Sequence, residues 1–217
     1  MNHTVSAYPP ALDASVQALA AQFDGVFGTE TIERFVHESY DRLAETARVP
    51  QHLPVLTERF ARQRLRAAAR VDGHDLSGIP TVLFLCVHNA GRSQMALGFF
   101  ERYAGDAAIA WSGGSEPGSA VDAGAIAAMA EKGIDISGEY PKPWTDEVVR
   151  AADVVISMGC GDACPVYPGK RYEEWTLTDP AGADLEVVRG VRDDLERRVL
   201  ALLGELGVAP VGRSEQP

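Results

Sequence analysis

Cys86 and Arg92 are the residues of this 217-residue chain whose spacing most directly predicts chemistry. The sequence CVHNAGR separates them as C-x5-R, and the apolar residues 81–87 lead into it. A loop of this length can turn several backbone N–H groups toward one point, and a helix that begins at Arg92 adds its positive N-terminal end. Such a loop binds a tetrahedral oxyanion, which an arginine can hold through two oxygens. The cysteine then lies beside the anion as a thiolate, placed for in-line attack on the central atom.

The other residues of this loop suit the same role. Asn89 and Gly91 tolerate the left-handed conformations that a tight turn needs. The hydroxyl group of Ser93 can donate a hydrogen bond to the Cys86 thiolate. We therefore expect Cys86, Arg92 and Ser93 to act in catalysis. The expected oxyanion-binding residues are Val87, His88, Asn89, Ala90, Gly91 and Arg92. The C-x5-R spacing taken alone is also compatible with a non-catalytic Cys86 that is only a small buried residue at the end of a strand.

Strands and helices alternate in the sequence after residue 80. Apolar runs predict strands at residues 81–87, 108–114 and 153–159, and residues 171–177 can hold a fourth strand. Helices are predicted at residues 92–105, 122–133 and 184–207. This alternation predicts the α/β class, with a four-stranded parallel sheet flanked by helices. Ligands of such sheets bind beyond the carboxyl ends of the strands, and Cys86 and Cys160 both follow such ends.

The first third of the chain has a different pattern. Apolar residues recur at helical spacing in residues 12–23, 31–43 and 54–70, which predicts a small three-helix segment. We expect residues 1–75 to form an N-terminal helical bundle and residues 80–208 to form the catalytic domain. The bundle is expected to stabilise the protein or to form a homodimer. A DNA-binding role is the weaker alternative, because basic residues do not gather on one recognition helix.

The composition limits the partners and the compartment. A formal net charge of -11 argues against a general nucleic-acid binder. No apolar run approaches about 18 residues, so no membrane span is expected, and the N-terminal sequence lacks the pattern of a signal peptide. An odd, sparse set of cysteines is typical of cytosolic thiols rather than of a disulfide framework. We expect a cytoplasmic protein.

The remaining two cysteines, Cys160 and Cys164, lie four residues apart in the sequence MGCGDACP. Two thiols this close form a disulfide only if the backbone bends suitably. Zinc binding is a weak alternative, because the stretch offers two cysteines and no histidine. Two inert buried cysteines are the third possibility.

The sequence CVHNAGRSQMA closely resembles the signature loop of arsenate reductases built on the low-molecular-weight protein tyrosine phosphatase fold. The resemblance extends to WSGG at residues 111–114, GIDISG at 133–138 and TDPAG at 178–182, and covers roughly residues 80–206. The reductase branch fits best, because tyrosine phosphatases of this fold usually have a second cysteine before the arginine.

This resemblance implies reduction of arsenate to arsenite in arsenic detoxification, with phosphate and sulfate as substrate mimics. It implies Asp179 as the proton donor and a disulfide relay from Cys86 to Cys160 to Cys164, recycled by thioredoxin. No cofactor is expected. Some relatives bind potassium beside the signature loop through an acidic residue, but the matching position here is Leu97. Asn89 and Ser112 are still present near the expected potassium site, but without the acidic residue no metal is expected.

Three other functions stay open at this point. The reductase can be recycled by mycothiol or glutaredoxin, in which case Cys160 and Cys164 are dispensable. A phosphomonoesterase of the low-molecular-weight phosphatase type would use Cys86 to form a phospho-enzyme and Asp179 to protonate the leaving group. A non-catalytic oxyanion sensor is the weakest alternative, because Cys86, Arg92 and Asp179 are all present.

Overall fold

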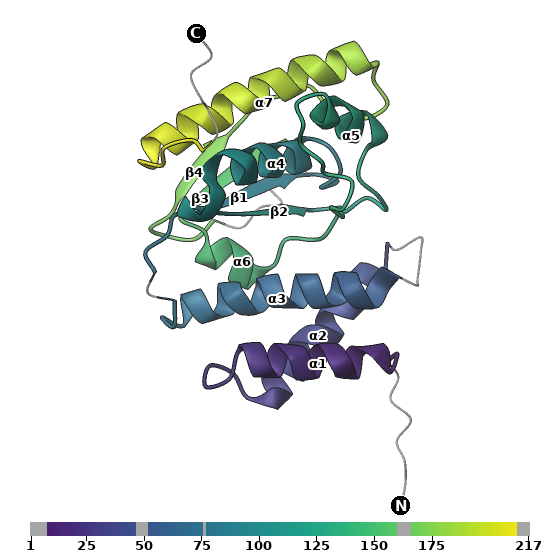
Figure 1. The fold of residues 1–217 in the computed structure, drawn as a ribbon, viewed down its shortest axis with the longest axis vertical. Helices are drawn as coiled ribbons and strands as arrows, with labels where there is room; N and C mark the ends of the chain where they lie inside the picture. The colour runs from purple at the N-terminus through teal and green to yellow at the C-terminus, as the bar shows by residue number, and fades with distance from the viewer. Residues whose placement is uncertain (1–7, 47–51, 76, 160–165, 212–217) are drawn as a thin grey trace, which may run out of the picture. The chain divides into compact units, whose positions relative to one another are not determined.

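A computed structural model describes residues 8–46, 52–75, 77–159 and 166–211 of the chain (Figure 1). The chain divides into two compact units, Met1–Leu76 and Ser77–Pro217. Cys160 and Cys164 lie outside the described residues. Within the described ranges, no helix has both the length and the apolar character that crossing a bilayer requires.

Three helices make up the first unit: α1 (Ala11–Gln22), α2 (Thr29–Ala44) and α3 (Leu53–Val71). Each of them contacts the other two. Their apolar stripes, spaced at the helical period, enclose a core of their own. The buried residues of this core are Leu12, Leu19, Phe23, Ile32, Phe35, Val36, Ala61 and Leu65. The predicted N-terminal helical segment is confirmed.

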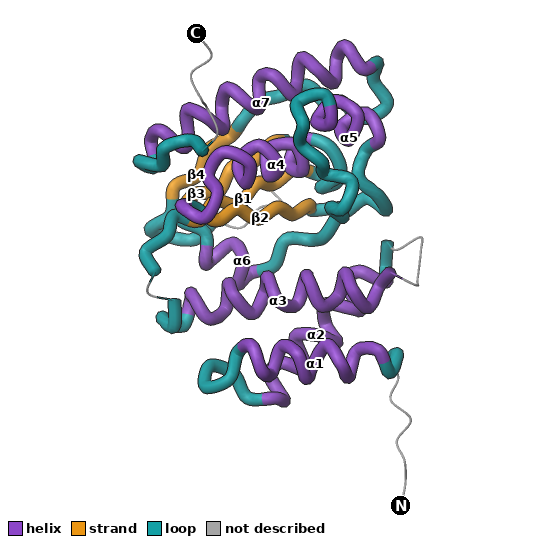
Figure 2. The backbone as a smooth tube through the Cα atoms, in the orientation of Figure 1, coloured by secondary structure: helices purple, strands orange, loops and turns teal. Residues whose placement is uncertain are grey.

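The second unit is built on a parallel sheet, drawn in orange in Figure 2. Its strands are β1 (Thr81–Cys86), β2 (Ile109–Gly114), β3 (Val154–Met158) and β4 (Arg171–Glu174), in the spatial order β2-β1-β3-β4. The predicted four-stranded parallel sheet is confirmed. Every residue of the central strand β1 is buried, as expected for a parallel strand covered on both faces. The register places Cys86 opposite Gly114 on β2 and Met158 on β3.

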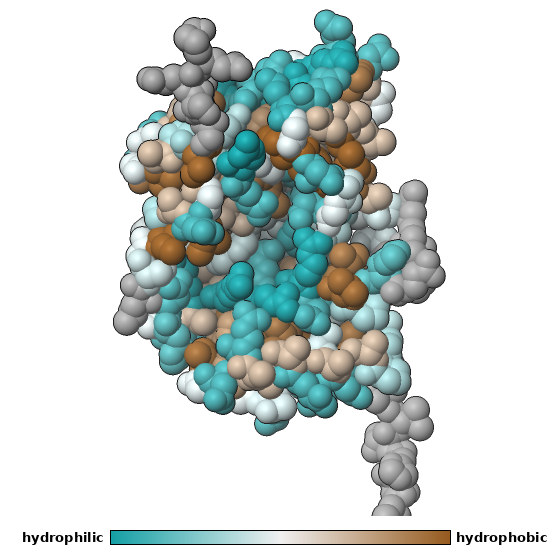
Figure 3. All heavy atoms as spheres, viewed as in Figure 1, coloured by the Kyte–Doolittle hydropathy of each residue, from teal (hydrophilic) through white to brown (hydrophobic). Residues whose placement is uncertain are grey.

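Helices cover both faces of this sheet (Figure 1). On one face lie α4 (Arg92–Ala104), α5 (Ala123–Ala130) and α7 (Leu185–Glu205), which share one apolar core with alternate residues of β1. The short helix α6 (Asp146–Ala151) lies on the other face and contacts β1. The side of α7 that faces away from the sheet is mostly hydrophilic (Figure 3).

Two short elements are absent from the predicted set, α6 and the 3-10 helix η2 (Gly105–Ala107). A helix of one or two turns contains too few residues to display a hydrophobic period, so the sequence pattern does not reveal it. The strand β4 also ends at Glu174, before the predicted end at residue 177.

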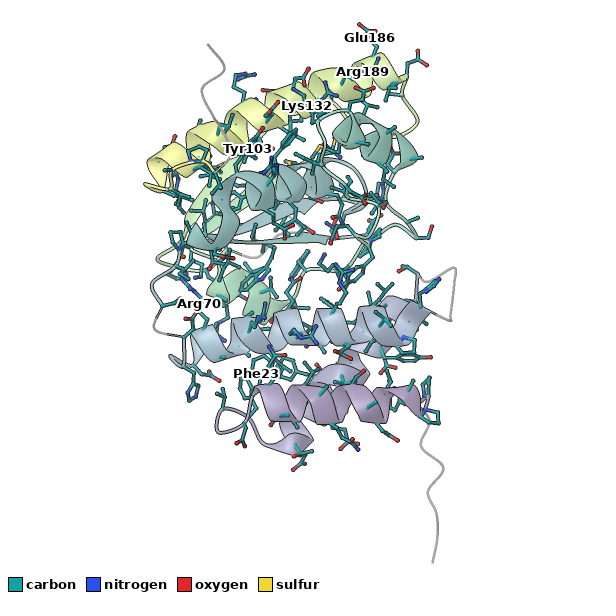
Figure 4. All side chains as sticks on the ribbon, in the orientation of Figure 1. Phe23, Arg70, Tyr103, Lys132, Glu186 and Arg189 are labelled. Atoms are coloured by element: carbon teal, nitrogen blue, oxygen red, sulfur yellow. The ribbon has the colours of Figure 1, made fainter. Side chains whose placement is uncertain are left out.

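Ion pairs fasten the end of α5 to α7, where Lys132 and Arg189 are labelled in Figure 4. Lys132 contacts Glu196 at 2.8 Å, and Arg189 contacts Glu131 at 2.6 Å. Hydrogen bonds from Arg189 and then from Arg192 lower the pKa of Glu131 to about 2. This carboxylate is therefore ionised at neutral pH and remains so in moderately acidic solution.

Candidate active site

The loop from Cys86 to Arg92 connects the buried end of β1 with the first residue of α4. Asn89 has a φ of 46°, and it is the one residue other than glycine with a positive φ among the described residues. Asparagine adopts this conformation more readily than most residues, because its short polar side chain can bond locally. A Cβ atom on Gly114, which faces the loop from β2, would lie 2.6 Å from the carbonyl oxygen of Val87. Glycine at position 114 therefore lets the loop pack directly on β2.

The thiol group of Cys86 is buried at the start of this loop. Its Sγ lies 3.0 Å from the Oγ of Ser93, and either atom can act as donor on distance alone. The side-chain amide of Asn89 donates to the same Ser93 Oγ at 2.8 Å. Because that oxygen already accepts from Asn89, its own hydrogen is free to point at the sulfur. The arrangement favours a hydroxyl that donates to a Cys86 thiolate.

Asn89 is itself held by two neighbours. Its Oδ1 accepts from the backbone N–H of Lys142 at 3.0 Å and from the Nε2 of Gln94 at 3.2 Å. The same Gln94 Nε2 also donates to the Asn89 carbonyl oxygen at 2.9 Å and to that of Tyr140 at 3.0 Å. Asn89, Gln94 and Lys142 are all buried. The shape of the loop is thus set by a buried polar network before any ligand arrives.

The guanidinium group of Arg92 is almost fully buried and lies between two other segments. Its Nη2 donates to the Oδ2 of Asp179 at 3.0 Å, in an ion pair whose carboxylate side chain is 53% exposed. On the other side, a Cβ atom on Gly159 would lie 3.1 Å from the Nη1 of Arg92. Gly159 is the last described residue before Cys160. Arg92 therefore contacts both the loop of Asp179 and the chain that leads to the second cysteine.

A cavity of about 110 Å³ opens above Cys86. Its walls are mostly small side chains and a proline, with one arginine, one histidine and two carboxylates. The lining residues are Cys86, His88, Ala90, Gly91, Arg92, Ala120, Asp122, Asp179, Pro180 and Ala181. A water molecule in bulk liquid occupies about 30 Å³, so the cavity has room for one small inorganic oxyanion. The described residues that line it include no phenylalanine, tyrosine or tryptophan.

His88 lies at the rim of this cavity and is exposed. Its Nδ1 lies 3.0 Å from the carbonyl oxygen of Glu116. A carbonyl oxygen can only accept, so the Nδ1 carries the hydrogen and the ring is fixed in orientation. The backbone N–H of Asp122 donates to the carbonyl oxygen of Ala90 at 2.9 Å, which ties the start of α5 to the loop.

The structure brings together most of the residues that the sequence predicts for the site. Cys86, His88, Ala90, Gly91, Arg92 and Asp179 line the cavity, with Ser93 and Asn89 directly behind them. Val87 contributes a carbonyl oxygen that accepts from the N–H of Glu116 at 2.9 Å. Cys160 and Cys164 lie outside the described residues. In the described ranges, no three His, Cys, Asp or Glu side chains gather as metal ligands would, and Ser112 bonds to the ammonium group of Lys142.

Sequence reasoning missed four residues at this site: Gln94, Asp122, Lys142 and Gly159. Asp122 precedes an alanine-rich helical stretch and carries the signal of a helix N-cap, and its Oδ1 does accept from the N–H of Ala125 at 2.9 Å. Gln94 and Lys142 act through contacts with residues that are distant in the chain, and Gly159 acts by letting the Arg92 side chain lie close to its backbone. No local pattern marks them.

Comparison with known proteins places this geometry in a family. The model of the low molecular weight phosphotyrosine protein phosphatase family matches residues 81–211, and a model described as protein-tyrosine-phosphatase-like, N-terminal domain, matches residues 12–69. A solved structure, the thioredoxin-dependent arsenate reductase of Corynebacterium glutamicum, is 43% identical with a TM-score of 0.82, covering 90% of this chain and 96% of its own.

Two curated relatives match a little more than half of this chain. The glutaredoxin arsenate reductase of Synechocystis is 41% identical over 128 residues, which cover 58% of this chain and 97% of the relative. Arsenate reductase 1 of Staphylococcus epidermidis is 38% identical over 123 residues, which cover 55% of this chain and 92% of the relative. The relatives thus share the loop-bearing domain, and the structure from Corynebacterium glutamicum extends over the helical segment as well.

Proposed function

The chain belongs to the low molecular weight phosphotyrosine protein phosphatase family, and we propose that within this family it is an arsenate reductase. The observation that carries the proposal is the cavity of about 110 Å³ above Cys86. Its small walls suit an inorganic oxyanion. The names of the relatives from Corynebacterium, Synechocystis and Staphylococcus agree with this assignment.

The first chemical step forms a bond between Cys86 and arsenic. Arsenate binds to the N–H groups of residues 87–91 and to the guanidinium group of Arg92. The Cys86 thiolate, stabilised by the Ser93 hydroxyl group, attacks arsenic, and one arsenic–oxygen bond breaks. The leaving oxygen departs as water with a proton from Asp179. The position of Asp179 supports this role, because its carboxyl group lies on the cavity wall.

The electrons for reduction come from thiols. The Cys160 thiolate attacks the sulfur of Cys86, a sulfur–sulfur bond forms, and the sulfur–arsenic bond breaks with its electron pair left on arsenic, which leaves as arsenite. Cys164 then attacks Cys160, so that the disulfide moves to Cys160–Cys164 and Cys86 is free again. The register supports this order, because Met158, two residues before Cys160, pairs with Cys86.

An external dithiol must then reduce the Cys160–Cys164 disulfide. We propose thioredoxin, the reductant on which the Corynebacterium relative depends by its name. The name of the Synechocystis relative makes glutaredoxin the second candidate, and mycothiol is a third. All of these reactions need reduced thiols, which the cytoplasm maintains. We therefore propose a cytoplasmic location.

A phosphomonoesterase is the alternative function, and the family match favours it directly. In that reaction the Cys86 thiolate would attack phosphorus and Asp179 would protonate the leaving alkoxide or phenoxide. Cys160 and Cys164 would then have no part in turnover. This difference separates the two functions experimentally.

The experiment is arsenate-dependent NADPH oxidation with thioredoxin and thioredoxin reductase, for the wild type and for Cys86→Ser, Cys160→Ser and Cys164→Ser. Loss of turnover in all three variants supports the relay. Loss in Cys86→Ser alone would contradict it, and the same assay with glutaredoxin and glutathione, or with mycothiol, then identifies the reductant. Hydrolysis of an aryl phosphate by the wild type without any arsenate turnover would replace the reductase by the phosphatase.

For the first unit we propose a stabilising or dimerising role. Its closed core of buried residues supports a folding unit of its own. Sedimentation equilibrium of the full chain tests the dimer, and a monomeric mass at all concentrations would leave stabilisation as its role.

A further inference from the structure

Asp122 places a carboxylate in the wall of the cavity above Cys86. It is partly buried and directly precedes the first residue of α5. The segment that carries it runs along the Cys86–Arg92 loop. The N–H groups of Glu116, Gly118 and Asp122 donate to carbonyl oxygens of that loop at 2.9, 2.8 and 2.9 Å. These three hydrogen bonds fix Asp122 beside the loop.

The oxygen atoms of the two carboxylates in the cavity wall differ in what they contact. In Asp179, Oδ2 accepts from Arg92 at 3.0 Å and Oδ1 accepts from the N–H of Ala181 at 3.2 Å. In Asp122, Oδ1 caps α5 by accepting from the N–H of Ala125 at 2.9 Å. The Oδ2 of Asp122 has no donor among the residues that the structure describes. This oxygen therefore remains to accept a hydrogen bond from a ligand in the cavity.

A carboxylate oxygen at this place distinguishes oxyanions by their protons. A carboxylate can only accept hydrogen bonds, and so can a fully deprotonated oxyanion such as sulfate, so the two repel each other. An oxyanion that carries an O–H group can donate it to the carboxylate, and the hydrogen bond then offsets the repulsion. Arsenate and phosphate keep one or two protons near neutral pH, whereas sulfate keeps none. The Oδ2 of Asp122 thus favours the first two anions over the third.

We propose that Asp122 makes the site selective for oxyanions that carry a proton, by accepting a hydrogen bond from their O–H group through its Oδ2. Monohydrogen arsenate and monohydrogen phosphate bind, and sulfate, which has the same charge and a similar tetrahedral shape, is disfavoured. The loop N–H groups and Arg92 hold the oxygens without protons, so each part of the site matches one kind of ligand oxygen. The inference rests on the proposed function in that the loop must bind an oxyanion.

Asp122→Asn tests this role with little change in shape. Asparagine caps a helix as well as aspartate does, so its oxygen can keep the hydrogen bond with Ala125. Its NH2 group takes the place of Oδ2, so an acceptor becomes a donor. Loss of the negative charge strengthens the binding of both dianions by the same factor, but only monohydrogen phosphate loses a hydrogen bond. Because a hydrogen bond to a charged group is worth about tenfold in affinity or more, the preference for phosphate over sulfate should fall at least about tenfold.

The measurement is an NMR titration of the labelled full-length protein with inorganic phosphate and with sulfate at constant ionic strength. A mildly alkaline buffer keeps phosphate chiefly as the monohydrogen dianion, so the two ligands carry the same charge. Asp135→Asn is the matched control, because it removes the same charge from an exposed carboxylate that accepts from the N–H of Ser137 at 2.8 Å and does not line the cavity. Asp122→Ser is the second variant. Serine also caps helices but has no carboxylate, so it should lower the preference as well.

The outcomes are distinct. A preference for phosphate that falls in both Asp122 variants and persists in Asp135→Asn supports the role of Asp122. Equal tightening of both anions in Asp122→Asn would overturn it, since the carboxylate would then act by its charge alone, and so would two unchanged dissociation constants. Unfolding of both Asp122 variants would also overturn it, because the residue would then serve the fold as a helix cap. A wild type that binds neither anion in the loop would instead count against the proposed function itself.

Discussion

Gly159 lies where an added side chain would meet the guanidinium group of Arg92. Its φ is +80°, and a Cβ atom at this position would lie 3.1 Å from the Arg92 Nη1. Such a contact is tighter than ordinary van der Waals packing, so one partner has to move by a few tenths of an ångström. Arg92 is buried and bonded to Asp179, so its movement changes the grip on an oxyanion.

The expected effect of Gly159→Ala has two parts. An alanine at positive φ costs about 1–2 kcal/mol of unfolding free energy wherever it occurs. A hydrogen bond to a charged group contributes about 1.5–3 kcal/mol, and a shift of a few tenths of an ångström loses only part of it. We therefore expect the dissociation constant of inorganic phosphate to rise about three- to tenfold.

Gly169 supplies the matched control. Its φ is +79°, and a Cβ atom there would meet nothing within 4 Å. Gly169→Ala should lose the same unfolding free energy in urea denaturation and leave the phosphate constant unchanged. Phosphate binding is the right assay, because it does not depend on the neighbouring Cys160. Equal phosphate affinity in the two variants would refute the contact between Gly159 and Arg92 as the cause.

Three further predictions use single substitutions. Ser93→Ala removes a hydrogen bond to a charged sulfur, so kcat/KM for arsenate should fall about 10- to 100-fold in the coupled assay; an unchanged value would exclude the bond to Cys86. Asp179→Asn removes the proton donor, so kcat should fall about 100-fold or more, and retained turnover at neutral pH would assign the proton to another group. Glu131→Gln should lower the unfolding free energy at about pH 6 in urea denaturation. The folded-state pKa of Glu131 is lowered from 4.5 to about 2, so this difference should vanish as the pH falls through that window. A difference that stays constant with pH would contradict the ion pairs with Arg189 and Arg192.

The parts of this protein that sequence predicts are those encoded by neighbouring residues. The strand before Cys86, the turn residue Asn89 and the helix from Arg92 follow one another in the chain, so local rules place them. Ser93 follows the loop directly in the chain. Three of the strands and the long closing helix α7 are found for the same reason, since each displays its apolar pattern over enough residues.

The features that the sequence does not predict depend on contacts between segments that are distant in the chain. Lys142 reaches the loop from a stretch that reads only as a proline-containing connection, and its burial becomes visible only when Gly114 is seen to pair beside it. Gly159 reads as an ordinary strand-end glycine until Arg92 is found against it. The helix α6, six residues long, is too short to show a period. Such features depend on tertiary packing, which single-sequence patterns do not carry.

The ion pair between Arg92 and Asp179 gives an incoming anion a competitor within the protein. The Oδ2 of Asp179 lies 3.0 Å from the Nη2 of Arg92, a donor that a bound oxyanion would use. An anion that binds through this donor has to displace the carboxylate, so its apparent affinity is its intrinsic affinity multiplied by the fraction of molecules in which Arg92 is released. A tetrahedral oxyanion that also bonds to the loop N–H groups would overcome this cost more readily than an anion held by Arg92 alone.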